Sequence, residues 1–145
     1  MKKIIITSVI LGFSAFANLI FAQQVTGVQR QAIQSDNIQK FKAAFTKADY
    51  DKCLSVKDAS YTMLSYSALN NKKNISEFLI TNKSDVNKAC NGVTPLMNAA
   101  MFGQKDMVKM LLAKGADKNM KDTNGLAARD YALKYNFSAV AAMLK

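Results

Sequence analysis

The stretch NGVTPLMNAAMFGQKDMVKMLLAKGADKN, residues 91–119, holds the only proline of the chain and three of its six glycines. Pro95 directly follows Thr94, which is typical of a helix start, because threonine accepts an unpaired backbone N–H and proline fits the first helical position. Gly103 and Gly115 lie further along, and glycine readily adopts the positive φ that often ends a helix. The stretch therefore predicts two short helices, ending near Gly103 and Gly115.

This pattern recurs along the chain with a period of 32 or 33 residues. A shift of 32 places LLAKGADKN, residues 111–119, on LITNKSDVN, residues 79–87. The same period aligns Gly103 with Asn71 and Asn136, and asparagine tolerates the left-handed backbone region well. A period of this length indicates stacked helix–turn–helix units.

These residues resemble the ankyrin repeat, which has a period of 33 residues and a T-P-L-H-x-A signature. The match is closest over 91–124, where NG-V-TPL--AA--G is followed by V--LL--GAD-N. The resemblance covers about 61–145 and implies an all-α ankyrin-repeat solenoid of stacked helix–turn–helix units with short β-turn fingers. Met97 replaces the histidine of the signature, so we expect the hydrogen bond of that histidine to Thr94 to be lost.

We expect three recognisable repeats after a degenerate first unit. The units span about 35–60, 61–92, 93–125 and 126–145. In the first, Ser35 is expected to cap a helix that carries Ile38, Phe41, Ala44 and Phe45. Residues 23–34 are rich in glutamine and poor in large apolar residues, so we expect a flexible lead-in.

Residues 1–22 predict a signal peptide. Lys2 and Lys3 form a positive start, residues 4–21 are almost wholly apolar, and the small Ala22 precedes the expected cut. An uncleaved membrane anchor is the alternative, because the apolar run approaches the ~20 residues that span a bilayer. Polar residues inside the run and the missing basic flank after it favour cleavage. We therefore expect a periplasmic or secreted protein.

The mature chain would carry 18 basic and 10 acidic residues, a net charge of +8. Only Arg30 and Arg129 are arginines, whereas nucleic-acid sites commonly combine arginine forks with aromatic platforms. This composition indicates a solvated lysine surface and no nucleic-acid partner. A weak attraction to anionic lipid or to an acidic partner stays open.

The chain contains no histidine, which removes the usual general base and the commonest metal ligand. Two cysteines are too few for a structural zinc site. We therefore expect no catalytic residue, no metal and no cofactor.

Cys53 and Cys90 are the only cysteines, and in an oxidising compartment they would form one disulfide. The ankyrin resemblance places Cys90 in the finger between units two and three, and Cys53 near the finger before Tyr61. Consecutive ankyrin fingers are neighbours in space, so we expect a bond if the Cα atoms lie within ~7 Å. The alternative is two separate buried thiols.

The resemblance implies that the fingers and the exposed side of the first helices bind another protein. The corresponding positions are Tyr61, Leu69, Asn70, Val93, Met101, Phe102, Thr123, Asn124, Leu126, Lys134 and Tyr135. Leu69, Met101, Phe102 and Tyr135 would form an apolar and aromatic stripe of the composition enriched at interface centres. Alternatively, Phe102 and Tyr135 pad the helix pair against its neighbour.

We therefore expect an exported, monomeric module that binds a partner protein, either as a helper of an envelope enzyme or as an immunity protein that caps a toxin. One alternative is a small envelope hydrolase or transferase, which would need a convergent catalytic cluster that the scattered acidic residues do not suggest. A purely structural envelope protein is the third interpretation.

Export makes a direct prediction. Protein purified from its native host should have lost about 22 residues by intact-mass measurement, because the signal peptide is removed on export. A mass that still includes residues 1–22, found in the membrane fraction, would contradict this prediction.

Overall fold

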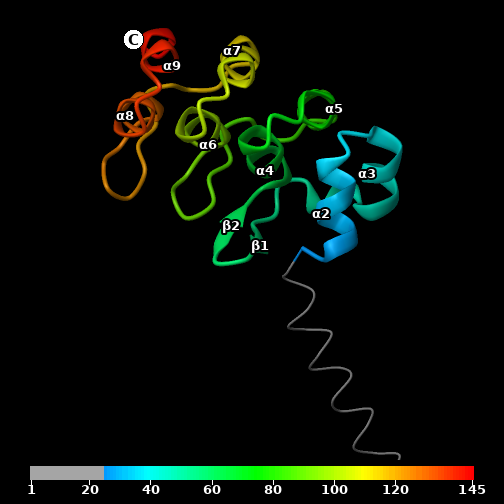
Figure 1. The fold of residues 1–145 in the computed structure, drawn as a ribbon. Helices are drawn as coiled ribbons and strands as arrows, with labels where there is room; N and C mark the ends of the chain where they lie inside the picture. The colour runs from blue at the N-terminus through cyan, green and yellow to red at the C-terminus, as the bar shows by residue number, and fades with distance from the viewer. Residues whose placement is uncertain (1–24) are drawn as a thin grey trace, which may run out of the picture.

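The computed structural model of the protein describes residues 25–145, so the expected signal peptide lies outside the described residues (Figure 1). Its elements are α2 (Gly27–Gln34), α3 (Ile38–Ala44), the 3-10 turn η1 (Lys47–Asp49), β1 (Leu54–Val56), β2 (Ala59–Tyr61), α4 (Met63–Leu69), α5 (Lys73–Thr81), α6 (Pro95–Met101), α7 (Lys105–Ala113), α8 (Ala128–Lys134) and α9 (Ser138–Met143). Within this part of the chain, none of the helices has the length and apolar character needed to cross a membrane.

The helices form two rows (Figure 1). The first helices of the pairs, α4, α6 and α8, lie side by side, and the second helices, α5, α7 and α9, cover them on one side. The connecting fingers project from the opposite side. Large apolar side chains, among them Leu64, Leu96 and Leu111, are fully buried between the rows. The expected all-α ankyrin-repeat solenoid is confirmed.

Threonine begins the first helix in two units, as predicted. The backbone N–H of Ser65 donates to Thr62 Oγ1 at 3.0 Å, and that of Met97 donates to Thr94 Oγ1 at 3.2 Å. The bond expected to be lost at Met97 is partly replaced, since the Thr94 N–H donates to Met97 Sδ at 3.4 Å. Sulfur is a weak acceptor, so this second bond adds little.

One residue with positive φ separates the two helices of every pair. The φ angles are 54° at Asn71, 66° at Gly103 and 64° at Asn136, which confirms the prediction that all three units keep the same turn geometry. Asp36, between α2 and α3, has φ of 49°. The segment before Ile38 therefore follows the same plan as the later units.

The expected flexible lead-in at residues 23–34 is wrong for the part that the structure describes. Residues 27–34 form α2, which begins with a capping box between Thr26 and Gln29. Its residues Ala32 and Ile33 are buried. The glutamine-rich composition predicted a flexible segment wrongly, because two buried side chains and a good cap suffice for a two-turn helix that packs on a neighbour.

The expected cap at Ser35 is also wrong. Ser35 ends α2, and its hydroxyl donates to the carbonyl of Ala32 at 2.7 Å. Asn37 instead caps α3, accepting from the Lys40 N–H at 3.0 Å. Because α2 and α3 form the pair, the first unit begins near Val25 rather than at residue 35.

Contacts at both ends of α2 hold the first unit together and join it to the second. The Asp36 carboxylate accepts from the backbone N–H groups of Asn74 and Ile75, at 3.3 and 3.0 Å, so it caps α5 from the neighbouring unit. The Val25 N–H donates to the carbonyl of Ser55 in β1 at 3.0 Å, and Val25 is buried. Both ends of α2 are thereby held.

The fingers are short and the first two are covalently joined. The first is an antiparallel hairpin in which Leu54 pairs with Tyr61, and the second contains an isolated bridge between Cys90 and Val93. The structure contains the expected disulfide between Cys53 and Cys90, whose Cα atoms are 5.6 Å apart. It crosses from the end of unit one to the finger after unit two.

Unit two has an unusually polar interior. The hydroxyls of Ser65, Ser67, Ser76 and Ser84 are buried and find no hydrogen-bond partner among the described residues. The 32-residue period aligns these serines with Met97, Ala99, Val108 and Ala116 of unit three. A buried polar group without a partner costs about 1–3 kcal/mol. Unit two is therefore packed less favourably than unit three.

Replacing Ser67 by alanine, the residue at the matching positions 99 and 132, should stabilise the protein. We expect the free energy of unfolding to rise by about 1 kcal/mol, or Tm by about 4 °C, because an unpartnered hydroxyl is removed. Thermal unfolding followed by circular dichroism measures the change. Ser138→Ala, at an exposed helical serine, controls for helix propensity. A loss of stability in Ser67→Ala would show that the hydroxyl has a partner.

Candidate protein-binding surface

Three of the predicted residues occupy equivalent places at the ends of the first helices. Asn70, Phe102 and Tyr135 are the C-caps of α4, α6 and α8, each directly before the residue with positive φ. We call these three the C-cap row. Phe102 is 49% exposed and Tyr135 is 45% exposed, whereas Asn70 is half-buried. The row is therefore open to a partner in units three and four.

The residues directly before the row are less available. Leu69 and Met101 are half-buried and pack against the core, and Lys134 is exposed. The Lys134 ammonium lies 5.8 Å from the centroid of the Tyr135 ring, within the range of a cation–π contact. The predicted stripe thus divides into supporting residues, Leu69 and Met101, and residues that face solvent.

Asn70, the residue of the C-cap row in unit two, is polar and takes part in contacts between units. Gln34 Nε2 donates to Asn70 Oδ1 at 3.0 Å, and Asn70 Nδ2 donates to the Tyr66 carbonyl at 2.8 Å. Lys72 Nζ donates to the Gln34 carbonyl at 2.7 Å. These bonds join Asn70 and Lys72 to the first unit, so this end of the row takes part in contacts between units.

Aromatic and aliphatic side chains replace the polar ones in units three and four. Phe137 is 37% exposed, and a Cβ added at Gly103 would meet its ring at 2.4 Å, so glycine is required there by space as well as by φ. Leu133 is 48% exposed. We call Phe102, Leu133, Tyr135 and Phe137 the aromatic patch. Four of the five large apolar side chains exposed within residues 25–145 belong to it.

Sequence reasoning missed Leu133 and Phe137, although both break the repeat. Leu133 takes the place of Ala100, which is fully buried in unit three. Phe137 takes the place of Gln104, whose side chain donates to the Leu69 carbonyl of the preceding unit at 3.1 Å. A large apolar residue at a place that is small or polar in the other units was the available signal.

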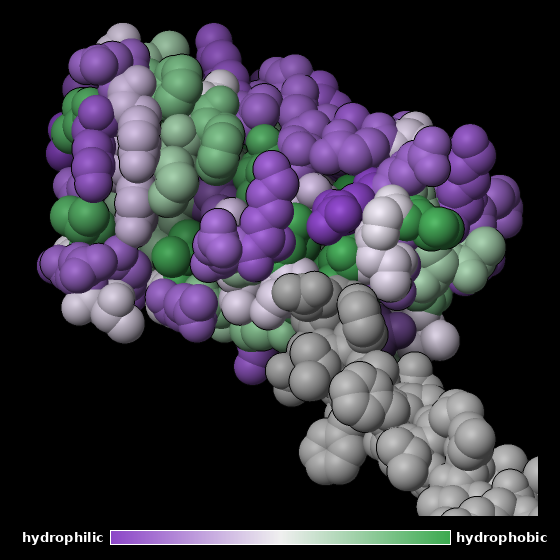
Figure 2. All heavy atoms as spheres, turned by 60° about the horizontal axis from the view of Figure 1, so that its bottom comes forward, coloured by the Kyte–Doolittle hydropathy of each residue, from purple (hydrophilic) through white to green (hydrophobic). Residues whose placement is uncertain are grey.

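The remaining predicted residues lie on the fingers. Tyr61 is half-buried with its ring centroid 5.7 Å from that of Tyr66, and burial raises the pKa of Tyr61. Val93 and Leu126 are half-buried, and only Thr123 and Asn124 are exposed. Figure 2, which turns the fingers forward, shows apolar and weakly polar side chains gathered over the C-terminal units on the left. Among the predicted finger residues, the apolar ones are therefore half-buried and the exposed ones, Thr123 and Asn124, are polar.

Asp122 organises the third finger. Its carboxylate accepts from the backbone N–H groups of Asn124 and Leu126 at 2.9 and 2.8 Å, and from the Tyr131 hydroxyl at 2.5 Å. These hydrogen bonds lower the pKa of Asp122, and the bond from the Tyr131 hydroxyl has the largest effect. Burial and the same carboxylate raise the pKa of Tyr131 to about 12, so it remains a neutral donor. The fourth unit thus fixes its finger without the threonine cap.

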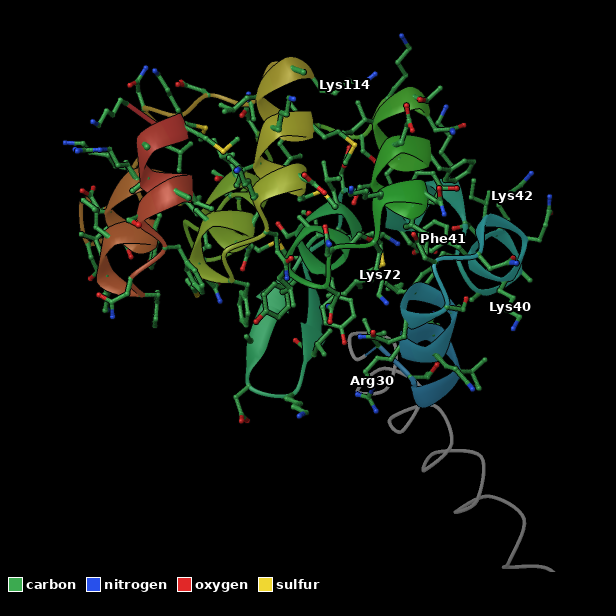
Figure 3. All side chains as sticks on the ribbon, turned by 45° about the horizontal axis from the view of Figure 1, so that its top comes forward. Arg30, Lys40, Phe41, Lys42, Lys72 and Lys114 are labelled. Carbon is green, nitrogen blue, oxygen red and sulfur yellow. A yellow bond between two sulfur atoms is a disulfide. The ribbon has the colours of Figure 1, made fainter. Side chains whose placement is uncertain are left out.

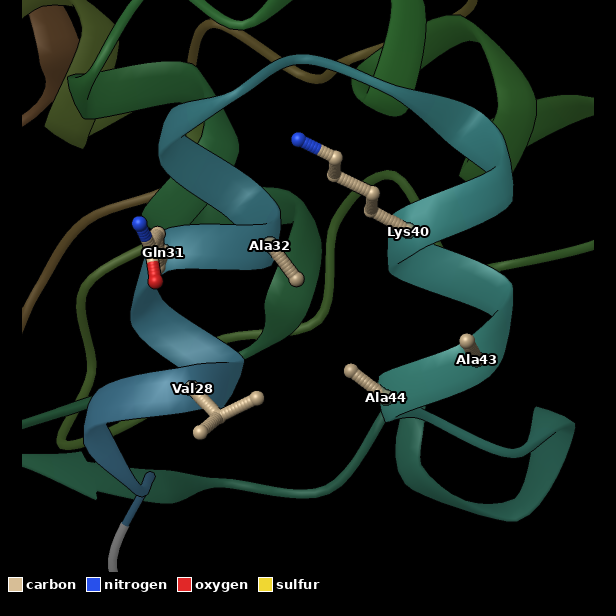
Figure 4. A pocket seen from close by; sticks show the side chains of 6 residues that line it. All are labelled: Val28, Gln31, Ala32, Lys40, Ala43 and Ala44. Carbon is tan, nitrogen blue, oxygen red and sulfur yellow. The ribbon is translucent and has the colours of Figure 1, made fainter.

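The described residues suggest no reactive centre. Within residues 25–145, no three His, Cys, Asp or Glu side chains gather where they could hold a metal ion. A hollow of about 330 Å³ lies between α2 and α3, at the end of the stack opposite the aromatic patch (Figure 4). It is lined by Val28, Gln31, Ala32, Lys40, Ala43 and Ala44. This lining, with Gln31 and Lys40 as its only polar side chains, does not place a nucleophile beside a base.

Paired helices, projecting fingers and an exposed apolar patch define a repeat scaffold that presents a surface rather than a pocket. The family model for ankyrin repeats (3 copies) matches residues 30–122, and the chain belongs to the ankyrin repeat family. The match begins inside α2, so it includes part of the first unit. Ankyrin repeats indicate a protein–protein interaction module.

Two relatives share the repeat over part of their length. Ankyrin repeat and SAM domain-containing protein 6 of Rattus norvegicus is 34% identical over 77 residues, which are 52% of this chain and 9% of that protein. ARF GTPase-activating protein Git of Drosophila melanogaster is 43% identical over 51 residues, 35% of this chain and 7% of that protein. The chain spans less than a tenth of the length of either relative. The similarity therefore concerns the repeats alone.

Proposed function

We propose that the chain is an exported, monomeric module that binds a partner protein through the aromatic patch. The observation that carries this proposal is that four of the five large apolar side chains exposed within residues 25–145 lie in units three and four, namely Phe102, Leu133, Tyr135 and Phe137, which are 37% to 49% exposed. Exposed apolar residues scattered singly need no explanation, but a group rich in aromatic rings is typical of an interface centre.

The neighbouring surface suits the rim of such an interface. Lys134 lies beside Tyr135, and the exposed finger residues Thr123 and Asn124 are polar. Interfaces commonly combine an apolar centre with a polar, solvent-accessible rim. The aromatic patch would thus provide most of the binding energy, and the rim would orient the partner.

The proposal includes the absence of a catalytic role. Eight of the ten acidic side chains accept hydrogen bonds from turns, caps or lysines within the described residues. Carboxylates in these positions hold the backbone of the fingers and helix ends. Acid–base catalysis needs such groups turned toward a substrate, so binding explains these side chains better than chemistry does.

The proposal that the protein is exported and meets its partner outside the cytoplasm rests on the sequence and on the disulfide. The N-terminal apolar segment favours a periplasmic or secreted location, where a disulfide between Cys53 and Cys90 would persist. Of the two roles expected there, enzyme helper or toxin immunity, both need a stable binding face and no chemistry. Capture of the partner from the envelope fraction of the native host would separate them.

Replacing Phe102 and Tyr135 together by alanine should weaken binding to the captured partner about thirtyfold or more, as expected for interface hot spots. Isothermal titration with the mature, oxidised protein measures the affinity. The circular dichroism spectrum and Tm should stay nearly unchanged, because both rings are about half exposed.

Val28→Ala is the matched control, because it removes an apolar side chain that is 74% exposed at the other end of the stack. It should leave the affinity unchanged. Undiminished binding by the folded Phe102→Ala/Tyr135→Ala variant would rule out the aromatic patch as the binding centre. Unfolding of that variant would support the alternative that these rings pad the helix pairs.

A further inference from the structure

Most of the net positive charge of residues 25–145 lies on one side of the stack. We define the outer face as the second helices α3, α5, α7 and α9 with the residues that follow each, namely 38–47, 73–83, 105–115 and 138–145. These residues include nine lysines and two acidic residues, a net charge of +7. The rest of the described chain carries nine basic and eight acidic residues, a net charge of +1.

The acidic side chains gather away from the outer face for a structural reason. Fingers, caps and helix–helix turns leave backbone N–H groups that need acceptors. Asp36, Asp51, Asp117, Asp122 and Asp130 accept from such groups. The first helices, fingers and turns are therefore nearly neutral, whereas Glu77 and Asp106 are the only acidic residues within the outer face.

The outer lysines remain almost unpaired. All nine are exposed, and within residues 25–145 only Lys73 forms an ion pair, with Asp106 at 2.7 Å. Figure 3 shows Lys42 extending from α3 and Lys114 at the end of α7, whereas Lys40, also on α3, borders the hollow between α2 and α3. The nine lysines are spread over all four units rather than concentrated at one point.

The outer face lacks the apolar centre that a protein partner requires. None of the five large apolar side chains exposed within residues 25–145 lies in it. Lysine is a hydrated point charge on a flexible stem, unlike the planar arginine fork that recognises defined groups. Spread lysines without an anchor match a diffuse negative surface better than a structured protein epitope.

We propose that the outer face is an electrostatic docking surface for the anionic headgroups of a membrane. The first helices and fingers, with the aromatic patch, then face away from the lipid and remain free for the protein partner. The attachment is peripheral and reversible, since it rests on charge without an inserted apolar segment. This role is separate from the partner-binding function proposed above.

Sedimentation with vesicles tests the proposal on the mature, oxidised protein. Vesicles of phosphatidylcholine with phosphatidylglycerol should bind the protein in about 50 mM salt, and binding should be lost near 500 mM salt, where screening is strong. Vesicles of phosphatidylcholine alone should not bind it. Equal binding to both vesicle types, or binding that resists salt, would overturn the proposal.

Two variants that lose the same number of charges test whether vesicle binding depends on the outer face or on net charge alone. Lys42→Gln/Lys109→Gln/Lys114→Gln removes three outer lysines and should weaken vesicle binding at least about tenfold, given that each lysine near an anionic surface contributes several-fold. Lys57→Gln/Lys88→Gln/Lys121→Gln removes three exposed lysines elsewhere and should cost less than about threefold. Equal losses would show that binding follows net charge only.

Two further measurements distinguish this proposal from others. The Phe102→Ala/Tyr135→Ala variant should bind vesicles like the unmodified protein, even if it no longer binds the partner. Soluble polyglutamate provides the other comparison. Binding to polyglutamate in the same low salt, without binding to anionic vesicles, would assign the outer face to an acidic protein and overturn the lipid assignment.

Discussion

Each unit turns from its first helix to its second through one residue with positive φ, and much of the structure depends on this turn. The angles are 49° at Asp36, 54° at Asn71, 66° at Gly103 and 64° at Asn136. The left-handed region costs about 1–2 kcal/mol for most residues with a Cβ, and glycine, asparagine and aspartate adopt it most readily. Once the turn is set, the residue before it and the residue after it occupy repeating places.

Those two places have different roles. The residue before the turn forms the C-cap row, from which Phe102 and Tyr135 reach solvent. The residue after the turn reaches back to the preceding unit: Lys72 and Gln104 donate to its backbone carbonyls, and the Phe137 ring lies against Gly103. One local constraint therefore positions both the contacts between units and the candidate interface.

The turn, together with the disulfide, also secures the weaker half of the stack. Asp36 uses its turn position to cap α5. The Cys53–Cys90 bond encloses unit two, with its four unpartnered hydroxyls, in a loop of sequence separation 37. In the chain-entropy estimate such a loop contributes about 3–4 kcal/mol, which offsets part of the cost of that interior. Units three and four have no comparable covalent link within the described residues.

The period, the threonine caps and the turn residues of the later units could be read from the sequence because they depend on local backbone chemistry. The first unit could not, since its turn residue Asp36 lies 35 residues before Asn71, outside the period of 32 or 33, and its helix α2 depends on contacts with β1. Likewise, the repeat pattern indicated Phe102 and Tyr135. Leu133 and Phe137 depart from the repeat in the sequence, but their exposure became clear only from the three-dimensional packing.

The chain from Val25 to Lys145 forms one connected stack, in which the first unit is held by its contacts to the second. Amide hydrogen exchange of the mature, oxidised protein tests this claim most directly. We predict that the amides of Ile33 and Phe41 exchange at least about a hundredfold more slowly than in an unfolded peptide, and that they lose more protection than the amides of α7 when the disulfide is reduced. Exchange of these two amides at unfolded-peptide rates in the oxidised protein would contradict it.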